Sequence, residues 1–182
     1  MLYNHLNPAT IDPAAYKPLL QTIAKGESNG NYNAHYGNAR NTAVRFTEMT
    51  IAEVLQWQED FVRQGHPSNA VGKYQIIRPT LVGLVTQLGL ARQATFNEAM
   101  QDRLAITLLE RRGAKAFIGK ELTREQFAAN LAKEWAALPA VTGPKPKKSY
   151  YAGDGLNHAR VSVNEVFAAL VLFEQRAVAQ QE

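Results

Sequence analysis

The chain has 182 residues, of which 46% are hydrophobic and 20% are charged, with a formal net charge of +4. These proportions exclude a disordered tail and a fibre, and they predict a single compact domain over residues 1–182 with a real hydrophobic core. Because cysteine is absent, disulfides, thiolate metal sites and a cysteine nucleophile are excluded. The four histidines are scattered without metal-ligand spacing, so we expect no metal and no other cofactor.

The basic balance favours a polyanionic partner, which leaves nucleic acid, an anionic membrane surface and the bacterial cell wall open. The first residues, "MLYNHLNPATIDP", lack a basic start followed by an apolar core, and no apolar run reaches the roughly 20 residues that cross a bilayer. We therefore expect synthesis in the cytosol and no stable insertion into a membrane. No helical face concentrates Lys and Arg, which argues against a nucleic-acid partner.

The first predicted helix carries Tyr16, Leu19, Leu20 and Ile23 at helical spacing and ends at Gly26. An Asn- and Gly-rich segment, 28–41, follows it, with room for short strands such as "NTAVRFTEM". The first helix is thus predicted to lead into a small irregular or β lobe.

Capping boxes predict the starts of three further helices, since each pairs Ser or Thr with Glu or Gln three residues later. Two more helices are predicted at "RPTLVGLVTQLG", with Pro79 in the first turn, and from Asn97 to Gly113. The helix that starts near residue 123 is expected to continue to Pro139. A row of helices with one small polar insertion predicts an α-rich α+β domain. The three boxes are Thr50 with Glu53, Thr123 with Gln126, and Ser162 with Glu165, and the predicted buried faces include Val54, Phe61, Leu84, Met100, Leu104, Leu108, Phe127, Trp135, Leu170 and Phe173.

Glu27, in "IAKGESNGNYNAHYG", is the sharpest candidate for chemistry. A carboxylate just past a helix C-terminus lies beside unpaired carbonyls and the negative end of the helix dipole, which disfavours ionisation. Such a group is a good proton donor near neutral pH, as cleavage of a glycosidic bond requires. The competing interpretation is a solvated glutamate in a surface loop.

The segment "AVGKYQ" is the second candidate. Gly72 permits close approach of the backbone, Tyr74 offers a ring face with a hydroxyl, and the Gln75 amide can bind an N-acetyl or hydroxyl group of a sugar. Packing and helix capping are the competing roles for the tyrosine and the glutamine.

The loop "PKPKKSYYAGDGLNHA" is the third candidate, as a binding site for the cell wall. Its lysines are suited to carboxylates of peptide stems or wall polymers, and its tyrosines to stacking on sugar faces. A solvated linker, and tyrosines that pack the loop onto the body, are the competing interpretations. The residues concerned are Lys145, Lys147, Lys148, Tyr150, Tyr151, Asp154 and Asn157.

Five blocks, "IAKGES", "AVGKYQII", "LGL", "QDRLAITLLERRGA" and "LAKEWAALP", resemble in order and spacing the lambda-type phage endolysins of the lysozyme-like superfamily. The resemblance covers about Tyr16 to Pro139. It implies a lysozyme-like fold, in which a helical body and a small lobe flank a cleft for peptidoglycan, and Glu27 falls on the family's catalytic acid. It also implies lytic transglycosylation, in which this one carboxyl group serves both proton transfers and leaves a 1,6-anhydro sugar end.

A hydrolase on the same fold would need a second carboxylate about 5–9.5 Å from Glu27, and the candidates are Glu48, Asp60 and Asp154. Phage lysozymes of the T4 type carry Asp or Cys where this chain has Tyr36, a departure that argues against hydrolysis. Both acids also have an interpretation without catalysis. Glu48 would be an acid that precedes the helix starting at Thr50, and Asp154 would form an Asx turn. A hydrolytic muramidase and a non-catalytic wall-binding or virion module both stay open.

We expect peptidoglycan glycan strands as the substrate and a monomeric enzyme. Delivery is expected from the host cytoplasm, through membrane pores made by a separate protein, or alternatively from the virion. The predicted substrate-binding residues around Glu27 and in the two loops are Ser28, Tyr36, Gly72, Tyr74, Gln75, Tyr150, Tyr151 and Asn157.

Overall fold

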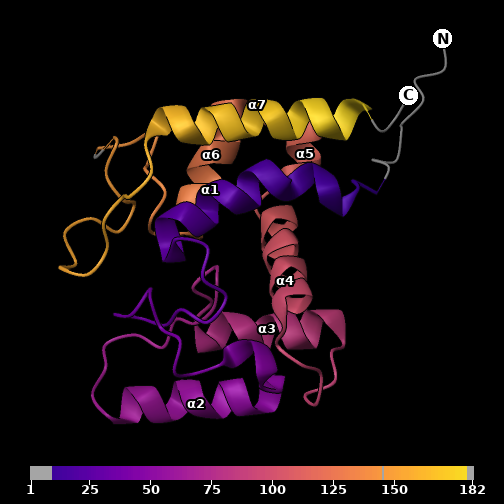
Figure 1. Cartoon of the computed structure of the whole chain (residues 1–182). Helices are drawn as coiled ribbons and strands as arrows, with labels where there is room; N and C mark the ends of the chain where they lie inside the picture. The colour runs from indigo at the N-terminus through magenta and orange to yellow at the C-terminus, as the bar shows by residue number, and fades with distance from the viewer. Residues whose placement is uncertain (1–9, 145, 180–182) are drawn as a thin grey trace. The chain divides into compact units, whose positions relative to one another are not determined.

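The computed structural model describes residues 10–144 and 146–179, and Figure 1 shows them as a mostly helical chain. Seven α-helices are present in this part of the chain, and its β structure consists of isolated bridges. The predicted helix-rich composition is therefore confirmed. No helix in these residues is long and apolar enough to cross a membrane.

The chain divides into two compact units, which we describe separately. The central unit is Ile23–Thr107, and the terminal unit is the described part of Met1–Thr22 and Leu108–Glu182. Helices α1 (Lys17–Ser28) and α4 (Glu98–Arg111) each contain a boundary between the units. The single domain expected from the sequence stays a prediction.

Three helices begin where the capping boxes predict. At the start of α2 (Ile51–Arg63), the Thr50 hydroxyl accepts from the Glu53 N–H at 3.2 Å, and the Glu53 carboxylate accepts from the Thr50 N–H at 2.7 Å. The same exchange precedes α6 (Arg124–Ala132) and α7 (Val163–Ala179). Each box satisfies backbone donors that a helix start would otherwise leave unpaired.

Two further predicted helices are confirmed as α3 (Arg78–Leu88) and α4. Pro79 lies in the first turn of α3, and Gly89 ends that helix in the left-handed region with φ of 59°. The Asn97 side chain accepts from the Met100 N–H at 2.9 Å, which caps α4. Met100 itself is only partly buried, whereas Leu104 is fully buried.

Two details of the terminal unit differ from the prediction. Helix α6 ends at Ala132 rather than near Pro139. Trp135 beyond it is still buried as expected, and so is Leu138, because a turn folds them back onto the core. A short helix, α5 (Ala114–Ile118), follows Gly113 and was not predicted, since it is too short to show a periodic apolar face.

The core of the terminal unit contains a cluster of aromatic rings. α7 packs on α5 and α6 and on the 3-10 helix η1 (Pro13–Tyr16), and Figure 1 shows α7 lying across α5 and α6. The Tyr16 and Phe173 ring centroids are 4.9 Å apart, and Phe117 stacks on Phe127 at 5.2 Å. The Tyr16 hydroxyl donates to Glu110 at 3.3 Å, so the one polar atom of this buried ring has a partner.

In the central unit, α2 packs on α3, and the Trp57 ring stacks on Phe61 with centroids 4.4 Å apart. The predicted strand "NTAVRFTEM" is wrong, because its residues form a loop and the 3-10 helix η2 (Phe46–Glu48). Side-chain bonding to the backbone explains the difference. The buried Asn41 amide donates to the carbonyls of Asn33 and Val44 at 2.6 and 2.7 Å, which bends the segment out of an extended course.

Candidate functional site

Glu27 lies in the last turn of α1 and is partly exposed. The prediction that this helix ends at Gly26 is wrong, since α1 continues through Ser28. The chain enters the left-handed region only at Asn29, with φ of 53°, and Gly30, with φ of 83°. A glycine within a helix costs only about 1 kcal/mol relative to alanine, so the helix passes Gly26 and ends where left-handed residues follow.

Ser28 joins this turn to the second candidate segment. Its side chain is 1% exposed, and its hydroxyl donates to the Lys73 carbonyl at 2.7 Å, across 45 residues of sequence. The structure therefore brings the residue after Glu27 into contact with the "GKYQ" loop. The hydroxyl of Ser28 is used inside the protein to hold that loop.

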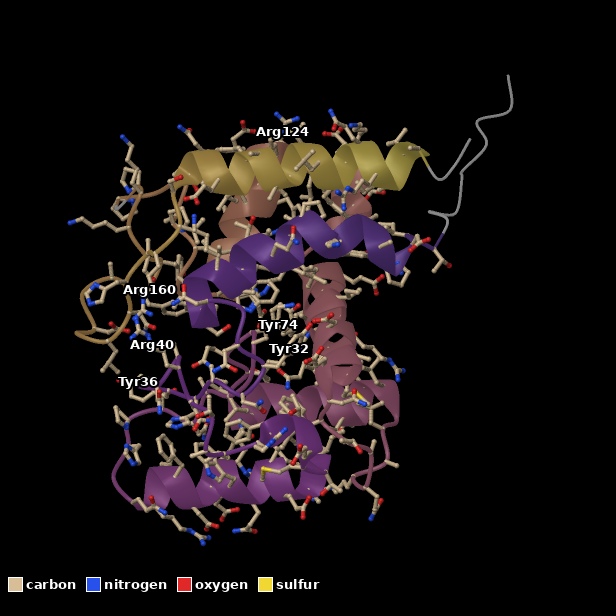
Figure 2. All side chains as sticks on the ribbon, viewed as in Figure 1. Tyr32, Tyr36, Arg40, Tyr74, Arg124 and Arg160 are labelled. Atoms are coloured by element: carbon tan, nitrogen blue, oxygen red, sulfur yellow. The ribbon has the colours of Figure 1, made fainter. Side chains whose placement is uncertain are left out.

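The loop 70–76 is a tight turn of isolated β-bridges. Val71 and Ile76 exchange backbone hydrogen bonds of 2.9 and 3.2 Å. The Gly72 N–H donates to the Ala34 carbonyl at 2.8 Å, and the Tyr36 N–H donates to the Ala70 carbonyl at 2.9 Å. These bonds fix the loop against the segment that carries Tyr36, whose side chain is partly exposed and is labelled in Figure 2.

Gly72 is required at its position for two reasons. Its φ of 79° lies in the left-handed region, and a Cβ atom there would lie 2.4 Å from the Oε1 atom of Gln101. The close approach expected at this glycine is thus made by a side chain of α4. Gln75 also has positive φ, and its side-chain amide donates to the Gly72 carbonyl at 2.9 Å.

Tyr74 is 1% exposed, and its hydroxyl donates to Asp102 at 2.5 Å. Tyr32, which Figure 2 shows beside Tyr74 near α4, donates to the same carboxylate at 2.9 Å. Burial, followed by the bond to Asp102, raises the pKa of both phenols above the usual value near 10. Both hydroxyls therefore remain hydrogen-bond donors at neutral pH. Binding of substrate by Tyr74 stays a prediction.

Two buried glutamines hold the loop 70–76 and were not predicted. Gln58 of α2 and Gln101 of α4 are both 0% exposed. The Gln58 amide donates to the carbonyls of Asn69 and Ile76 at 3.0 and 2.9 Å. The Gln101 side chain accepts from the Lys73 N–H at 2.9 Å. A signal was present in the sequence, because each glutamine stands in helical register with the apolar face of its helix.

The carboxylates considered for hydrolysis all have local partners. Glu48 pairs with Arg45 at 2.7 Å, and Asp60 accepts from Gln56 at 3.0 Å. Asp154 accepts from the Leu156 N–H at 2.8 Å, so the Asx-turn interpretation is confirmed. The Leu156 amide, together with bonds from residue 157, lowers the pKa of Asp154. Among the described residues, no cluster of His, Asp and Glu side chains suits a metal ion.

The third candidate, the loop 140–160, belongs to the terminal unit. Tyr150 is 53% exposed and Tyr151 is 41% exposed, and their rings meet edge to face with centroids 5.1 Å apart. The Tyr151 hydroxyl donates to the Lys133 carbonyl at 2.6 Å, which ties the loop to the end of α6. Lys147 and Lys148 are exposed, whereas Lys145 lies outside the described residues. Asn157 donates its side-chain amide to Asp154 at 2.5 Å.

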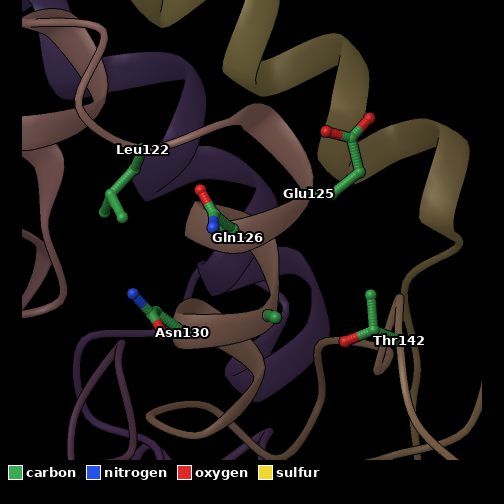
Figure 3. A pocket seen from close by; sticks show the side chains of 6 residues that line it. Leu122, Glu125, Gln126, Asn130 and Thr142 are labelled. Carbon is green, nitrogen blue, oxygen red and sulfur yellow. The ribbon is translucent and has the colours of Figure 1, made fainter.

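A separate pocket of about 300 Å³ in the terminal unit, shown in Figure 3, contains none of the predicted site residues. The Gln126 side chain that faces it accepts from the Thr123 N–H at 2.8 Å as part of the α6 cap. The pocket is therefore not the candidate site. Its lining consists of Leu122, Glu125, Gln126, Ala129, Asn130 and Thr142.

The comparison with known families identifies the class of protein. The Endolysin family profile matches residues 17–156, a span that includes Glu27, the loop 70–76 and both exposed tyrosines. The chain belongs to the endolysin family, whose members are phage enzymes that degrade the peptidoglycan of the bacterial cell wall. No match was found among curated proteins or among solved structures. The family predicted from the sequence is thus confirmed.

Proposed function

We propose that this endolysin cleaves the β-1,4 bond between N-acetylmuramic acid and N-acetylglucosamine as a lytic transglycosylase, with Glu27 as its catalytic acid and base. One observation carries the choice of Glu27 as the acid. Glu27 lies in the last turn of α1 directly before Ser28, whose hydroxyl holds the Lys73 carbonyl at 2.7 Å, and both segments lie within the family match.

In the proposed reaction, the neutral Glu27 carboxyl group donates its proton to the glycosidic oxygen as the bond from C1 of the muramic acid breaks. The sugar then carries oxocarbenium character. The Glu27 carboxylate next takes the proton of the C6 hydroxyl of the same sugar, and O6 bonds to C1. The products are a 1,6-anhydro end and a free N-acetylglucosamine hydroxyl, and Glu27 is returned to its neutral form without consumption of water.

The partners of the other carboxylates support a mechanism with a single acid. Glu48 is paired with Arg45, Asp60 is bonded to Gln56, and the Asp154 oxygens accept from its own turn. A hydrolase must hold a carboxylate ready to activate water. Each of these three groups is instead engaged in a local bond.

We further propose that the loop 140–160 binds the cell wall. The exposed rings of Tyr150 and Tyr151 are suited to the apolar faces of sugars, and the exposed Lys147 and Lys148 to the carboxylates of stem peptides. Asn157, whose amide is already bonded to Asp154, would keep the loop in shape and present its remaining oxygen to an N-acetyl group.

For delivery, we propose release from the host cytoplasm through pores made by a separate protein, and action as a monomer. Expression inside the host with and without such a pore-forming protein tests this. Lysis only in its presence is expected, whereas lysis by the protein alone would contradict the proposal. Carriage in the virion would be detected by probing purified particles for the protein.

Digestion of purified peptidoglycan, followed by mass analysis of the muropeptides, tests the chemistry. We expect anhydro products from the parent and a rate about 100- to 10,000-fold lower in Glu27→Gln, the range that general acid–base catalysis contributes. Glu121→Gln, which removes a carboxylate from an exposed position, is the matched control and is expected to be as active as the parent.

Other outcomes contradict the proposal in distinguishable ways. Reducing-end products, heavier by one water than the anhydro products, would identify a hydrolase and direct attention to Glu48→Gln and Asp154→Asn. Equal lysis by the parent and Glu27→Gln would remove Glu27 from catalysis. An absence of products from both would favour a wall-binding module.

A further inference from the structure

Two consecutive residues of α4 hold both the segment that follows α1 and the loop 70–76. The Gln101 side chain accepts from the Lys73 N–H at 2.9 Å and donates to the Tyr32 carbonyl at 3.1 Å. The next residue, Asp102, accepts from the hydroxyls of Tyr74 and Tyr32 at 2.5 and 2.9 Å. Thus α4 binds both the backbone and the side chains of these two segments.

The Lys73 side chain completes the arrangement. Its ammonium group donates to the Tyr32 hydroxyl at 2.9 Å and lies 3.7 Å from Asp102. It also lies 4.3 Å from the centroid of the Tyr32 ring, and the side chain is only 17% exposed. The Lys73 ammonium group therefore compensates the charge of the Asp102 carboxylate beside the two phenols.

These bonds connect to the last turn of α1, which carries Glu27, through two segments. On one side the Lys73 carbonyl accepts from Ser28, the residue after Glu27. On the other side Tyr32 follows the left-handed turn that ends α1. We call this set of residues, Ser28, Tyr32, Lys73, Tyr74, Gln101 and Asp102, the Lys73 clamp.

We propose that Gln101 and Asp102 are positioning residues that act through the Lys73 clamp to fix the last turn of α1, and with it the carboxyl group of Glu27. The inference rests on the proposed function, because it supposes that Glu27 transfers the proton. It adds a requirement that the reaction scheme alone does not contain. Proton transfer needs the acid within about 2.6–3.2 Å of the oxygen that it protonates, so a loosened turn lowers the rate even when Glu27 is intact.

A role in stability alone makes a different prediction. If the Lys73 clamp only stabilised the fold, its loss would lower the unfolding temperature and leave the kcat of the folded enzyme unchanged. A positioning role lowers kcat at temperatures where the variant is fully folded. KM changes little in that case, because substrate contacts elsewhere are kept.

Two variants and one control separate these roles. Asp102→Asn keeps the shape of the side chain but removes the charge that Lys73 and both phenols face. Tyr32→Phe removes only the hydroxyl between Lys73 and Asp102, and it serves if Asp102→Asn does not fold. Glu121→Gln removes a carboxylate from an exposed side chain of the terminal unit and should match the parent.

The first measurement is hydrogen exchange of the Gly30 and Asn31 amides, which donate to the carbonyls of Ala24 and Ser28, both at 3.2 Å. In Asp102→Asn we expect these amides to exchange about five- to tenfold faster, the change that loss of one ordinary hydrogen bond produces. Unchanged exchange in Asp102→Asn and Tyr32→Phe would overturn the inference, whether or not the protein is active.

The second measurement is steady-state cleavage of glycan strands well below the unfolding temperature. We expect kcat to fall about 10- to 100-fold in Asp102→Asn, as a misplacement of about 1 Å causes, with KM within about threefold of the parent. An active parent with unchanged kcat in both variants would overturn the inference alone. A parent without glycan products would overturn the proposed function and the catalytic part of the inference together.

Discussion

The loops 70–76 and 140–160 contain the same kinds of residue but use them differently. In the first loop, Tyr74 is 1% exposed and bonds to Asp102, whereas in the second, Tyr150 is 53% exposed. Buried polar side chains from two helices reach the first loop, while the second is held by backbone bonds, by Asp154 and by the bond from the Tyr151 hydroxyl to the end of α6. The presence of tyrosine and lysine therefore does not reveal whether a loop binds a ligand or stabilises the fold. That depends on whether other residues of the protein bury these side chains and bond to them.

Replacement of one glycine in each loop tests this difference most strongly. Gly72 and Gly155 have nearly the same φ, 79° and 78°, but a Cβ atom meets Gln101 at the first and no atom within 4 Å at the second. We expect Gly72→Ala to lower the free energy of unfolding by about 3 kcal/mol, from left-handed strain and overpacking together. Gly155→Ala should lower it by about 1–2 kcal/mol, from strain alone.

Urea unfolding followed by circular dichroism measures both variants under the same conditions. The difference between the two losses measures the contacts that the added Cβ atom makes with the side chains of Gln101 and Phe96. Equal losses would contradict the proposal that α4 packs tightly on the first loop, since the backbone strain is matched.

Removal of one hydroxyl from each loop gives a smaller effect. Tyr74→Phe takes a buried donor from Asp102 and should lower the free energy of unfolding by about 1–2 kcal/mol. Tyr151→Phe loses the bond to the Lys133 carbonyl at a 41% exposed position, where water replaces it, so we expect a change within about 0.5 kcal/mol. A loss in Tyr151→Phe as large as that in Tyr74→Phe would mean that both loops are equally important for stability.

The pH dependence of stability gives a second test of the stabilising role of the Tyr74 hydroxyl. The pKa of Tyr74 is raised in the folded protein, by burial first and then by Asp102, so the folded phenol stays protonated where the unfolded one ionises. Its contribution is fully present below the usual pKa of about 10 and is lost as the pH rises above it. At pH 10.5 we expect Tyr74 to have lost about 0.8 kcal/mol of its contribution relative to pH 7.

Urea unfolding of the parent and Tyr74→Phe at pH 7 and pH 10.5 measures this loss. Stability of the parent should fall by the larger amount, because the variant lacks the phenol. An equal fall in the two proteins would contradict the assigned cause, since other groups would then account for the whole pH effect.

The fold was predicted well wherever the information is local. The Thr50 capping box and the left-handed Gly89 each depend on neighbours within four residues, so the sequence is enough to locate them. The strand expected from Asn41 was wrong because the Asn41 side chain bonds to backbone carbonyls three and eight residues away, which no alternation pattern reports. The prediction that α1 ends at Gly26 was wrong for a related reason, since the positive φ angles of the residues that follow determine where the helix ends.

The candidate site was predicted only in part. Glu27 and the "GKYQ" segment were selected from their residue types, and the structure joins them through Ser28 and Lys73. The sequence did not reveal which side chains face them. Tyr32 and Asp102 are 70 residues apart, and pairing over that distance follows from the packing of α4, which no local pattern encodes.

The exposed ring of Tyr150 should affect substrate binding rather than stability. We expect Tyr150→Ala to raise KM for glycan strands about three- to fivefold with kcat unchanged, because a stacked ring contributes about 0.5–1.5 kcal/mol. Tyr150→Phe keeps the ring and is the control, with KM near that of the parent. If kcat fell in Tyr150→Ala while KM stayed constant, this ring would act on the reaction rather than on binding.

The lysines of the same loop should give the smallest effect. Lys147 and Lys148 are exposed, and water and salt weaken the attraction between exposed charges and the carboxylates of stem peptides. We therefore expect Lys147→Gln with Lys148→Gln to raise KM about twofold at low ionic strength, and the difference from the parent to vanish near 0.5 M salt, where screening acts within a few ångströms. A tenfold change that persists in high salt would require desolvated contacts at these lysines. The loop 140–160 would then make water-excluded contacts with its ligand, as the loop 70–76 does with Asp102 of α4. The two loops would differ in what they bind, a ligand or the protein itself, and not in how exposed their binding side chains are.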